Sequence, residues 1–279
     1  MMHWLARLPL GVAHALGRIL GWFIYALSPA WRRRLRANLA QAGYTDAHTR
    51  RAAVAEAGKL ILETPGLWLR PREEVMALVR RVKGLEAARA ARAAGKGIVF
   101  LTPHFGCFEI TAHVVAEAGP LTALYRPAKS ATLRRMMESG RQRKNVTLAA
   151  ANLGGVRQLL AALKRGEAIG ILPDQVPAQG EGEWVEFFGR PAYTMTLAGK
   201  LAARADVATF VVLGVRMPRG HGYDVHVLPL VPAREGESPV RRVNRALEQA
   251  IRDWPEQYLW AYNRYKRPPG APPPPGGAP

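Results

Sequence analysis

The apolar residues of this chain form long helical stretches up to about residue 96 and short continuous runs after it. Ala, Arg, Leu and Glu dominate residues 35–96, which predicts helices interrupted at Pro65 and Pro71. After residue 96, short apolar runs that each stop within two residues of a proline predict buried strands. These runs are Ile98–Leu101, Leu121–Tyr125 and Ala168–Leu172.

Further strands and helices complete the predicted fold. Residues 207–215 and 223–230 are rich in β-branched side chains and predict a pair of strands. Strands that alternate with helices indicate an α/β fold with a mostly parallel central sheet flanked by helices. The expected helices are 108–118, 130–144, 155–165, 193–205 and 238–253.

The N-terminus combines an apolar stretch with a basic cluster. Leu8–Trp31 carries only Arg18 and His14 as ionisable groups, and the sequence WRRRLR begins at its last residue. This arrangement is expected at the cytoplasmic face of a membrane, so residues 1–36 are predicted to be membrane-associating helices. Arg18 and the short uncharged run Ile19–Trp31 favour helices that lie in the interface over one that spans the bilayer.

Two alternatives exist for the same N-terminal stretch. A signal peptide is disfavoured, because no small-x-small cleavage site precedes the basic cluster and arginines after an apolar run oppose export. The stretch also fits a buried helix of a soluble domain. At the other end, the Pro- and Gly-rich residues 269–279 predict a disordered tail, which leaves residues 37–268 as one domain.

The excess of basic residues limits the kinds of molecule that the protein is expected to bind. The chain has 40 Lys and Arg residues against 21 Asp and Glu residues, a formal net charge of +19, and residues 1–100 hold 17 of the former and 6 of the latter. Such an excess implies an anionic partner. There is no zinc-finger spacing, RNP-like strand or basic-region zipper, so a membrane surface or a phosphorylated substrate is favoured over nucleic acid.

Cofactor motifs and a disulfide framework are also missing from the sequence. Neither GxGxxG after a strand nor GxxxxGK[ST] occurs, which argues against a dinucleotide or P-loop site. We expect no cofactor and no metal. The single cysteine, Cys107, excludes a disulfide scaffold and is expected to be a small buried residue.

Polar residues follow three of the predicted strands. His104, Arg126 and Asp174 each come shortly after one of them. Ligands of parallel sheets bind beyond the carboxyl ends of the strands, so these three residues are candidates for one site. Arg126 suits a phosphate or a developing oxyanion. Asp174 is expected to position Arg126 or a sugar hydroxyl, unless it only caps a turn.

His104 is the candidate base. In the segment TPHFGCFE it lies in a loop before a helix, with Glu109 in the first turns of that helix and Gly106 permitting a tight turn between them. A carboxylate that holds one ring nitrogen fixes the tautomer and makes the other nitrogen a general base. We therefore expect Glu109 to orient His104. The alternative is a strand-end histidine bonded to backbone.

Seven segments carry a resemblance to a known family. An apolar strand followed by H-x4-E is the signature of the lysophospholipid acyltransferase-like superfamily, and the chain most resembles its late acyltransferases of lipid A biosynthesis, the lauroyl/myristoyl transferases. At the positions of Cys107 and Phe108 that family more often has Asn and Trp. The matching segments are LGRILGWFIYAL, RRRLRANLAQAG, GKGIVFLTPHFGCFE, LYRP, ILPDQVP, VEFFGRPAYT and LWAYNRYKRP.

The resemblance implies acyl transfer from an acyl-carrier-protein thioester to a hydroxyl of a phosphorylated lipid A precursor, at the cytoplasmic face of the inner membrane. His104 is then the base assisted by Glu109, and backbone N–H groups near Gly106 are candidates to stabilise the oxyanion. Arg126, Asp174, Gln175 and Arg264 are expected to bind substrate. Two alternatives stay open: an acyltransferase of another lipid (a glycerophospholipid, aminolipid or glycolipid), and a non-catalytic basic protein that docks on membranes.

Overall fold

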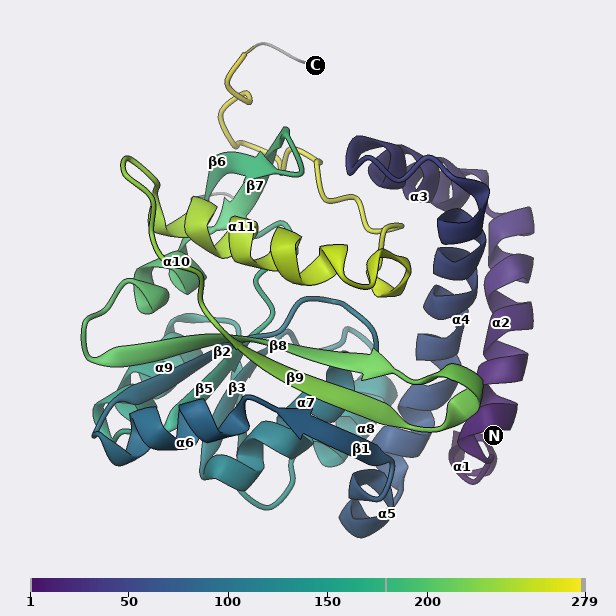
Figure 1. Cartoon of the computed structure of the whole chain (residues 1–279), viewed down its shortest axis with the longest axis horizontal. Coiled ribbons are helices and arrows are strands. Elements are labelled where there is room, and N and C mark those ends of the chain that lie inside the picture. The colour runs from purple at the N-terminus through teal and green to yellow at the C-terminus, as the bar shows by residue number, and fades with distance from the viewer. Residues whose placement is uncertain (1, 179, 277–279) are drawn as a thin grey trace.

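A seven-stranded sheet lies between two layers of helices in the computed structural model, which describes residues 2–178 and 180–276 (Figure 1). The strand order is β1-β9-β8-β2-β5-β3-β4, and neighbouring strands are parallel except for the antiparallel pair β8 and β9. This confirms the predicted fold class. The strands are β1 (Val79–Lys83), β2 (Gly97–Leu101), β3 (Leu121–Tyr125), β4 (Val146–Ala150), β5 (Ala168–Ile171), β8 (Val207–Arg216) and β9 (Tyr223–Pro229).

The two faces of the sheet bury two separate apolar clusters. Alternate residues of a strand point to opposite faces: in β2, Ile98 and Phe100 join one cluster, and Val99 and Leu101 join the other. The first face is covered by α6 (Leu85–Ala93), α7 (Phe108–Val115) and α8 (Ala131–Arg141). The second is covered by α9 (Leu153–Lys164), α10 (Thr196–Ala202) and α11 (Pro239–Arg252).

Four strands were missing from the sequence-based prediction or replaced in it by helix. β1 lies within the stretch predicted to be helical, and β4 follows a helix that is shorter than expected. The predicted helix 193–205 overlaps β7 (Arg190–Met195), which pairs with β6 (Gly182–Phe187), a strand that was also not predicted, in a separate antiparallel hairpin. Short 3₁₀ turns complete the chain: η1 (Ala116–Ala118), η2 (Pro218–Gly220) and η3 (Pro255–Gln257).

The N-terminal segment forms α1 (Met2–Ala6), α2 (Leu10–Leu27) and α3 (Pro29–Gln41), and α2 runs beside the long helix α4 (Ala47–Leu69), with the short α5 (Arg72–Met76) after it (Figure 1). Glycines permit this close approach. A Cβ on Gly17 would lie 2.6 Å from the Lys59 Cα, and a Cβ on Gly58 would overlap the backbone of Gly17 and Gly21. Helix α2 is therefore tightly docked on the domain, whatever its outer face contacts.

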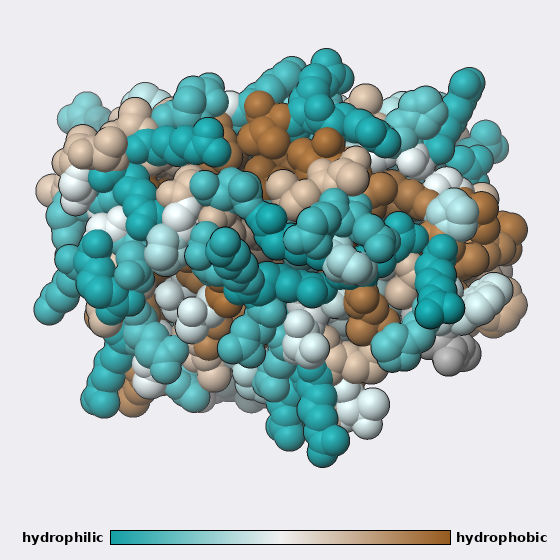
Figure 2. Space-filling view, turned by 90° about the horizontal axis from the view of Figure 1, so that it is seen from below, coloured by the Kyte–Doolittle hydropathy of each residue, from teal (hydrophilic) through white to brown (hydrophobic). Residues whose placement is uncertain are grey.

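The outer face of α2 exposes a stripe of large apolar side chains. Ile19 is 67% exposed and Phe23 60% exposed. By length and composition α2 is able to cross a membrane, with 22% of the helix buried inside the protein. In the space-filling view, apolar atoms gather at the edge of the molecule where Figure 1 has α2 (Figure 2). The stripe consists of Val12, Leu16, Ile19, Phe23 and Leu27.

A buried ion-pair cluster joins α2, α4 and β8. The Arg216 guanidinium is 2.6 Å from a Glu63 oxygen and 3.1 Å from a Glu56 oxygen, and the other Glu63 oxygen is 2.8 Å from His14 Nε2 on α2. Burial alone would raise the pKa of Glu63, but Arg216 and His14 outweigh it and lower that pKa to about 2. Because all these groups are buried, the cluster is stable only while its members stay together.

The C-terminal stretch packs further than expected. Ala271 is fully buried against Val176 and Tyr193, and the Pro272 carbonyl accepts a hydrogen bond of 2.9 Å from the Trp184 indole. These two positions of the predicted disordered tail, residues 269–279, therefore contact the domain. Residues 277–279 lie outside the described residues.

We predict that Gly17→Leu lowers the melting temperature of the detergent-solubilised protein, because the new side chain meets α4 backbone. Overpacking of this kind costs about 1–3 kcal/mol. Ala15→Leu is the matched control, since Ala15 lies on the same helix and is exposed. Equal melting temperatures for the two variants in differential scanning fluorimetry would contradict the tight packing of α2 on α4.

We predict that Glu63→Gln lowers the free energy of unfolding at pH 7 by about 3–5 kcal/mol, because it removes the main partner of a buried guanidinium. The native Glu63 pKa is below its ordinary value of 4.5, so its contribution is complete above about pH 4.5 and is lost as the pH falls towards 2. Urea unfolding at several pH values measures the free energy of unfolding of both proteins. This free energy should fall less between pH 4.5 and pH 2 in the variant than in the unmodified protein.

Glu167→Gln is the control for that experiment. Glu167 pairs with the exposed Arg165 at 2.7 Å, a surface interaction worth about 0–1 kcal/mol. If Glu167→Gln lowered the free energy of unfolding as much as Glu63→Gln, the buried cluster would contribute no more to stability than a surface ion pair.

Candidate active site

The loop between β2 and α7 holds His104 at the carboxyl edge of the sheet. Gly106 has a φ of 50°, a backbone conformation that suits glycine, and its N–H donates to the Gln257 carbonyl at 2.8 Å. The Cys107 N–H donates to the Gly214 carbonyl at 2.8 Å. Both N–H groups are therefore occupied, so neither of these two is free to stabilise an oxyanion. Their role is to fix the loop against β8 and η3.

Asp174 holds His104 from the neighbouring strand. One carboxylate oxygen lies 2.8 Å from His104 Nδ1, and the other accepts a hydrogen bond of 2.8 Å from the His104 backbone N–H. Strands β2 and β5 pair with Leu101 opposite Ile171, and the two residues lie three positions beyond that pair. Asp174 is 2% exposed; burial alone would raise its pKa, but the His104 ring and the two hydrogen bonds lower it.

The second nitrogen of His104 faces Gln175. The side-chain Nε2 of Gln175 is 3.0 Å from His104 Nε2. Because the Asp174 carboxylate accepts the proton on Nδ1, the neutral ring presents a lone pair at Nε2, and the amide N–H donates to it. The sequence analysis expected Gln175 to bind substrate. In the structure its side-chain amide is hydrogen-bonded to His104.

Glu109 lies elsewhere, which corrects the expectation that it orients His104. It stands in the first turn of α7, with its carboxylate hydrogen-bonded to the Trp68 indole at 3.0 Å and to Arg141 Nε at 3.0 Å. Arg141 also approaches the face of Trp68, with its guanidinium carbon 5.6 Å from the ring centroid. Glu109 is thus the counter-ion of Arg141, in a helix position where the dipole favours a carboxylate.

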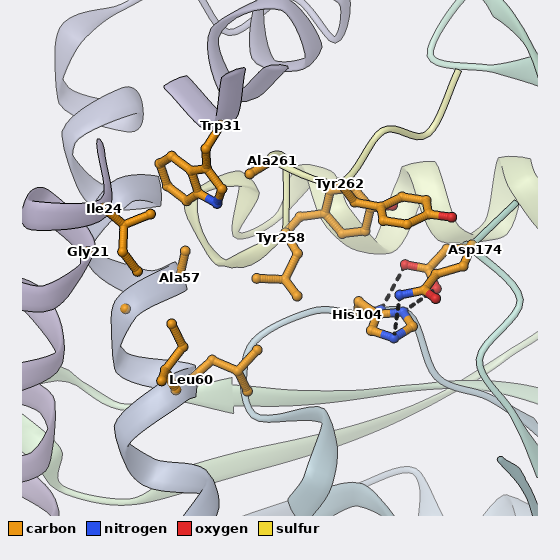
Figure 3. Close-up of a pocket in the computed structure, with 14 residues that line it drawn as sticks. Gly21, Ile24, Trp31, Ala57, Leu60, His104, Asp174, Tyr258, Ala261 and Tyr262 are labelled. Carbon is orange, nitrogen blue, oxygen red and sulfur yellow. Dashed lines mark hydrogen bonds and ion pairs between the residues drawn. The ribbon is translucent and has the colours of Figure 1, made fainter. Parts of the chain in front are cut away.

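An apolar pocket of about 320 Å³ leads from α2 and α4 to His104 (Figure 3). In Figure 3, Gly21, Ile24, Ala57 and Leu60 lie at one end and His104 and Asp174 at the other. We call it the apolar pocket. Its lining residues are Gly21, Ile24, Trp31, Ala57, Gly58, Leu60, Ile61, His104, Asp174, Gln175, Tyr258, Leu259, Ala261 and Tyr262.

A second pocket of about 240 Å³, which we call the polar pocket, reaches His104 from another side. Arg126 and Arg141 line it together with His104 and Gln175. The structure thus brings three predicted residues, His104, Arg126 and Asp174, to one site, and Arg126 is exposed there. The remaining lining residues are Leu124, Tyr125, Met137, Ala151, Leu172, Val176, Pro177 and Met195.

A smaller cavity of about 70 Å³ lies between the sheet and α7 and shares Arg141, Leu124, Tyr125 and Leu172 with the polar pocket. We call it the inner cavity. Phe108 lines it, and its ring centroid is 5.0 Å from that of His104. Apolar side chains from β2, β3 and β4 form much of its wall, including Phe100, Leu121, Ala123, Val146 and Leu148.

Arg264 is a buried structural residue, which corrects the expectation that it binds substrate. It is 2% exposed and donates to the Tyr193 carbonyl at 2.9 Å and to Thr194 Oγ1 at 2.6 Å, so it ties the C-terminal segment to β7. Burial lowers the pKa of Arg264. Cys107 is fully buried, as predicted.

Sequence reasoning missed Arg141, Trp68 and Arg216. Arg141 lies at the end of the basic helix α8 among several exposed arginines, so nothing in the local sequence distinguishes it. Arg216 is the last residue of β8 and follows a run of apolar residues. An arginine at the end of a buried strand is a sequence signal of a buried charge. Within the described ranges, no group of three or more His, Cys, Asp or Glu residues is placed to hold a metal ion.

Several curated proteins are similar to this chain in sequence. The chain is similar to the lipid A biosynthesis palmitoleoyltransferase of Escherichia coli K12, with 28% identity over 75% of this chain and 68% of that protein. It is also similar to the lauroyltransferase of the same organism, with 28% identity over 77% and 71%. For the myristoyltransferase the values are 25% identity over 90% and 80%.

The model of one protein family covers almost the whole chain. The family is described as bacterial lipid A biosynthesis acyltransferase, and the match runs over residues 1–267. That range includes α2, the loop that carries His104 and the segment after β5 that carries Asp174. The chain therefore belongs to the bacterial lipid A biosynthesis acyltransferases.

Proposed function

We propose that the protein transfers a fatty acyl chain from an acyl-carrier-protein thioester to a hydroxyl of a phosphorylated lipid A precursor, with His104 as the general base and Asp174 as the group that orients it. The observation that carries this proposal is the Asp174–His104 pair, with Nδ1 2.8 Å from the carboxylate and with His104 lining two pockets. The family membership supports acyl transfer to lipid A.

The reaction needs one proton to move. His104 Nε2 takes the proton of the acceptor hydroxyl while the oxygen attacks the thioester carbonyl carbon. As the tetrahedral intermediate collapses, the new C–O bond remains, the C–S bond breaks and the sulfur takes the proton from His104. The Asp174 carboxylate stabilises the positive ring between these steps. General-base assistance of this kind contributes roughly 10²–10⁴-fold to the rate.

Arginines supply the positive charge for the intermediate and the substrate. Arg126 and Arg141 line the polar pocket beside His104, and a guanidinium suits both an oxyanion and a phosphate. The Glu109 carboxylate holds Arg141 in place. In this proposal Glu109 acts through Arg141 and not through the imidazole.

The apolar surfaces suggest where the lipid parts lie. The inner cavity offers an apolar wall for the transferred acyl chain, and the apolar pocket reaches α2, whose outer stripe is exposed. We propose that this stripe enters the cytoplasmic surface of the inner membrane and that the acceptor approaches along the apolar pocket. Helix burial in the interface together with arginine–headgroup attraction would supply the binding energy.

We predict that His104→Ala lowers the rate of acyl transfer in purified membranes by roughly 10²–10⁴-fold.

Asp174→Asn should lower kcat similarly and shift the pH profile of kcat, because it removes the carboxylate that favours the charged ring. Glu109→Gln should leave the pH profile of kcat unchanged, since its carboxylate binds Arg141 and Trp68. Undiminished transfer by His104→Ala would refute the mechanism and favour a docking protein without catalysis.

The acceptor is tested separately by mass spectrometry of lipid A from cells that lack the protein. The proposal expects one acyl chain fewer per lipid A molecule. An unchanged acylation pattern, together with His104-dependent transfer in vitro, would favour the alternative in which another lipid is the acceptor.

We predict that the double substitution Ile19→Glu and Phe23→Glu weakens binding to vesicles of anionic phospholipid by at least tenfold, because each buried side chain of this size contributes about 1.5–3 kcal/mol. Leu153→Glu is the control, since Leu153 is 79% exposed on α9, away from the stripe. Vesicle flotation measures the binding. Equal retention of both variants would show that the stripe does not enter the membrane.

A further inference from the structure

The amide of Gln175 occupies the nitrogen of His104 that the reaction needs. His104 Nε2 accepts this hydrogen bond at 3.0 Å, while Nδ1 is engaged by Asp174 at 2.8 Å. An acceptor hydroxyl must approach the same lone pair before it gives up its proton. The structure therefore has an internal donor in the position of the acceptor.

The position of Gln175 between the pockets makes this contact relevant to both substrates. His104 and Gln175 line the apolar pocket and also the polar pocket. A molecule that reaches the imidazole from either pocket therefore meets the Gln175 side chain. Water is able to enter by the same routes, because Gln175 and His104 are both partly exposed.

The backbone on both sides of Gln175 is fixed, so the side chain is the part that moves. Asp174 is held by two hydrogen bonds to His104, and the Val176 N–H donates to the Tyr262 hydroxyl at 2.9 Å. Pro173 and Pro177 limit the backbone further. Rotation about the side-chain bonds of Gln175 uncovers Nε2 without moving Asp174.

On the basis of the proposed function, we propose that Gln175 covers His104 Nε2 until the acceptor hydroxyl displaces it, and so suppresses hydrolysis of the acyl donor. The competing reaction uses the same base. His104 Nε2 would take a proton from water, the water oxygen would form a C–O bond to the acyl carbon, the C–S bond would break and the sulfur would take the proton. The products are a free fatty acid and the thiol of the carrier.

The amide discriminates between the two nucleophiles through binding energy. A large lipid acceptor makes many contacts that compensate for the loss of one hydrogen bond, whereas a water molecule brings few. A net hydrogen bond of ordinary strength corresponds to about 3- to 10-fold in an equilibrium. Gln175 is thus a positioning residue that sets the ratio of transfer to hydrolysis.

The test compares Gln175→Ala with the unmodified protein in detergent micelles, using acyl-carrier protein that bears a radiolabelled acyl chain. The ratio of free fatty acid to acylated acceptor should rise about 3- to 10-fold. Gln158→Ala, on the exposed face of α9, is the matched control and should leave the ratio unchanged. The double variant with His104→Ala should hydrolyse the donor only at background rate.

A second measurement needs no substrate. Diethyl pyrocarbonate reacts with an unprotonated imidazole nitrogen, so Gln175→Ala should speed modification of His104 several-fold, as followed by peptide mass spectrometry. Equal modification rates in both proteins would overturn the proposal, as would an unchanged hydrolysis ratio or extra hydrolysis that persists without His104. The proposed function fails separately if the unmodified protein neither transfers nor hydrolyses the acyl chain of the carrier thioester. A difference in the modification rates of His104 would then still support the contact with Gln175.

Discussion

The buried guanidinium of Arg216 joins the parts of the molecule that meet behind His104. It pairs with Glu56 and Glu63 of α4 and donates to the Gly106 carbonyl at 2.6 Å. A buried arginine is costly unless its charge and its N–H groups are all matched. The loop after β2 and helix α4 therefore take positions that satisfy Arg216. Since His14 of α2 shares the Glu63 carboxylate, the apolar N-terminal helix is tied to the same point.

The net charge of +19 understates the positive charge at the surface. Several acidic residues are used inside as counter-ions or hydrogen-bond acceptors, so they do not offset surface arginines at close range. These are Glu56, Glu63, Glu109, Asp174, Asp224 and Glu248, and they outnumber the buried arginines Arg216, Arg245 and Arg264. Exposed arginines and lysines consequently dominate the field that an approaching anion meets. A phosphorylated lipid, an anionic membrane and an acidic carrier protein would all be attracted by one charge distribution.

Local patterns predicted the parts of the fold that depend on short-range signals. The runs that became β2 and β5 are buried from end to end or nearly so, the run that became β3 is buried or half-buried, and their apolar composition is sufficient to recognise them. β1, with the sequence VRRVK, exposes most of its residues at the sheet edge, and its two valines among three basic residues gave no such signal. Arg264 was expected to bind substrate, and its sequence neighbours did not reveal its burial, because the burial of an arginine is set by distant partners, here Tyr193 and Thr194.

The two carboxylates near His104 show the same limit in the site itself. Glu109 is close in sequence, but helix α7 directs its side chain towards Trp68 and Arg141. Asp174 is 70 residues away from His104 along the chain, yet strands β2 and β5 are parallel neighbours with Leu101 opposite Ile171. Counting three residues beyond that pair reaches His104 on one strand and Asp174 on the other. Sheet register, rather than spacing within one motif, brings the Asp174 carboxylate to the His104 ring. The next residue, Gln175, contacts the other nitrogen of the same ring.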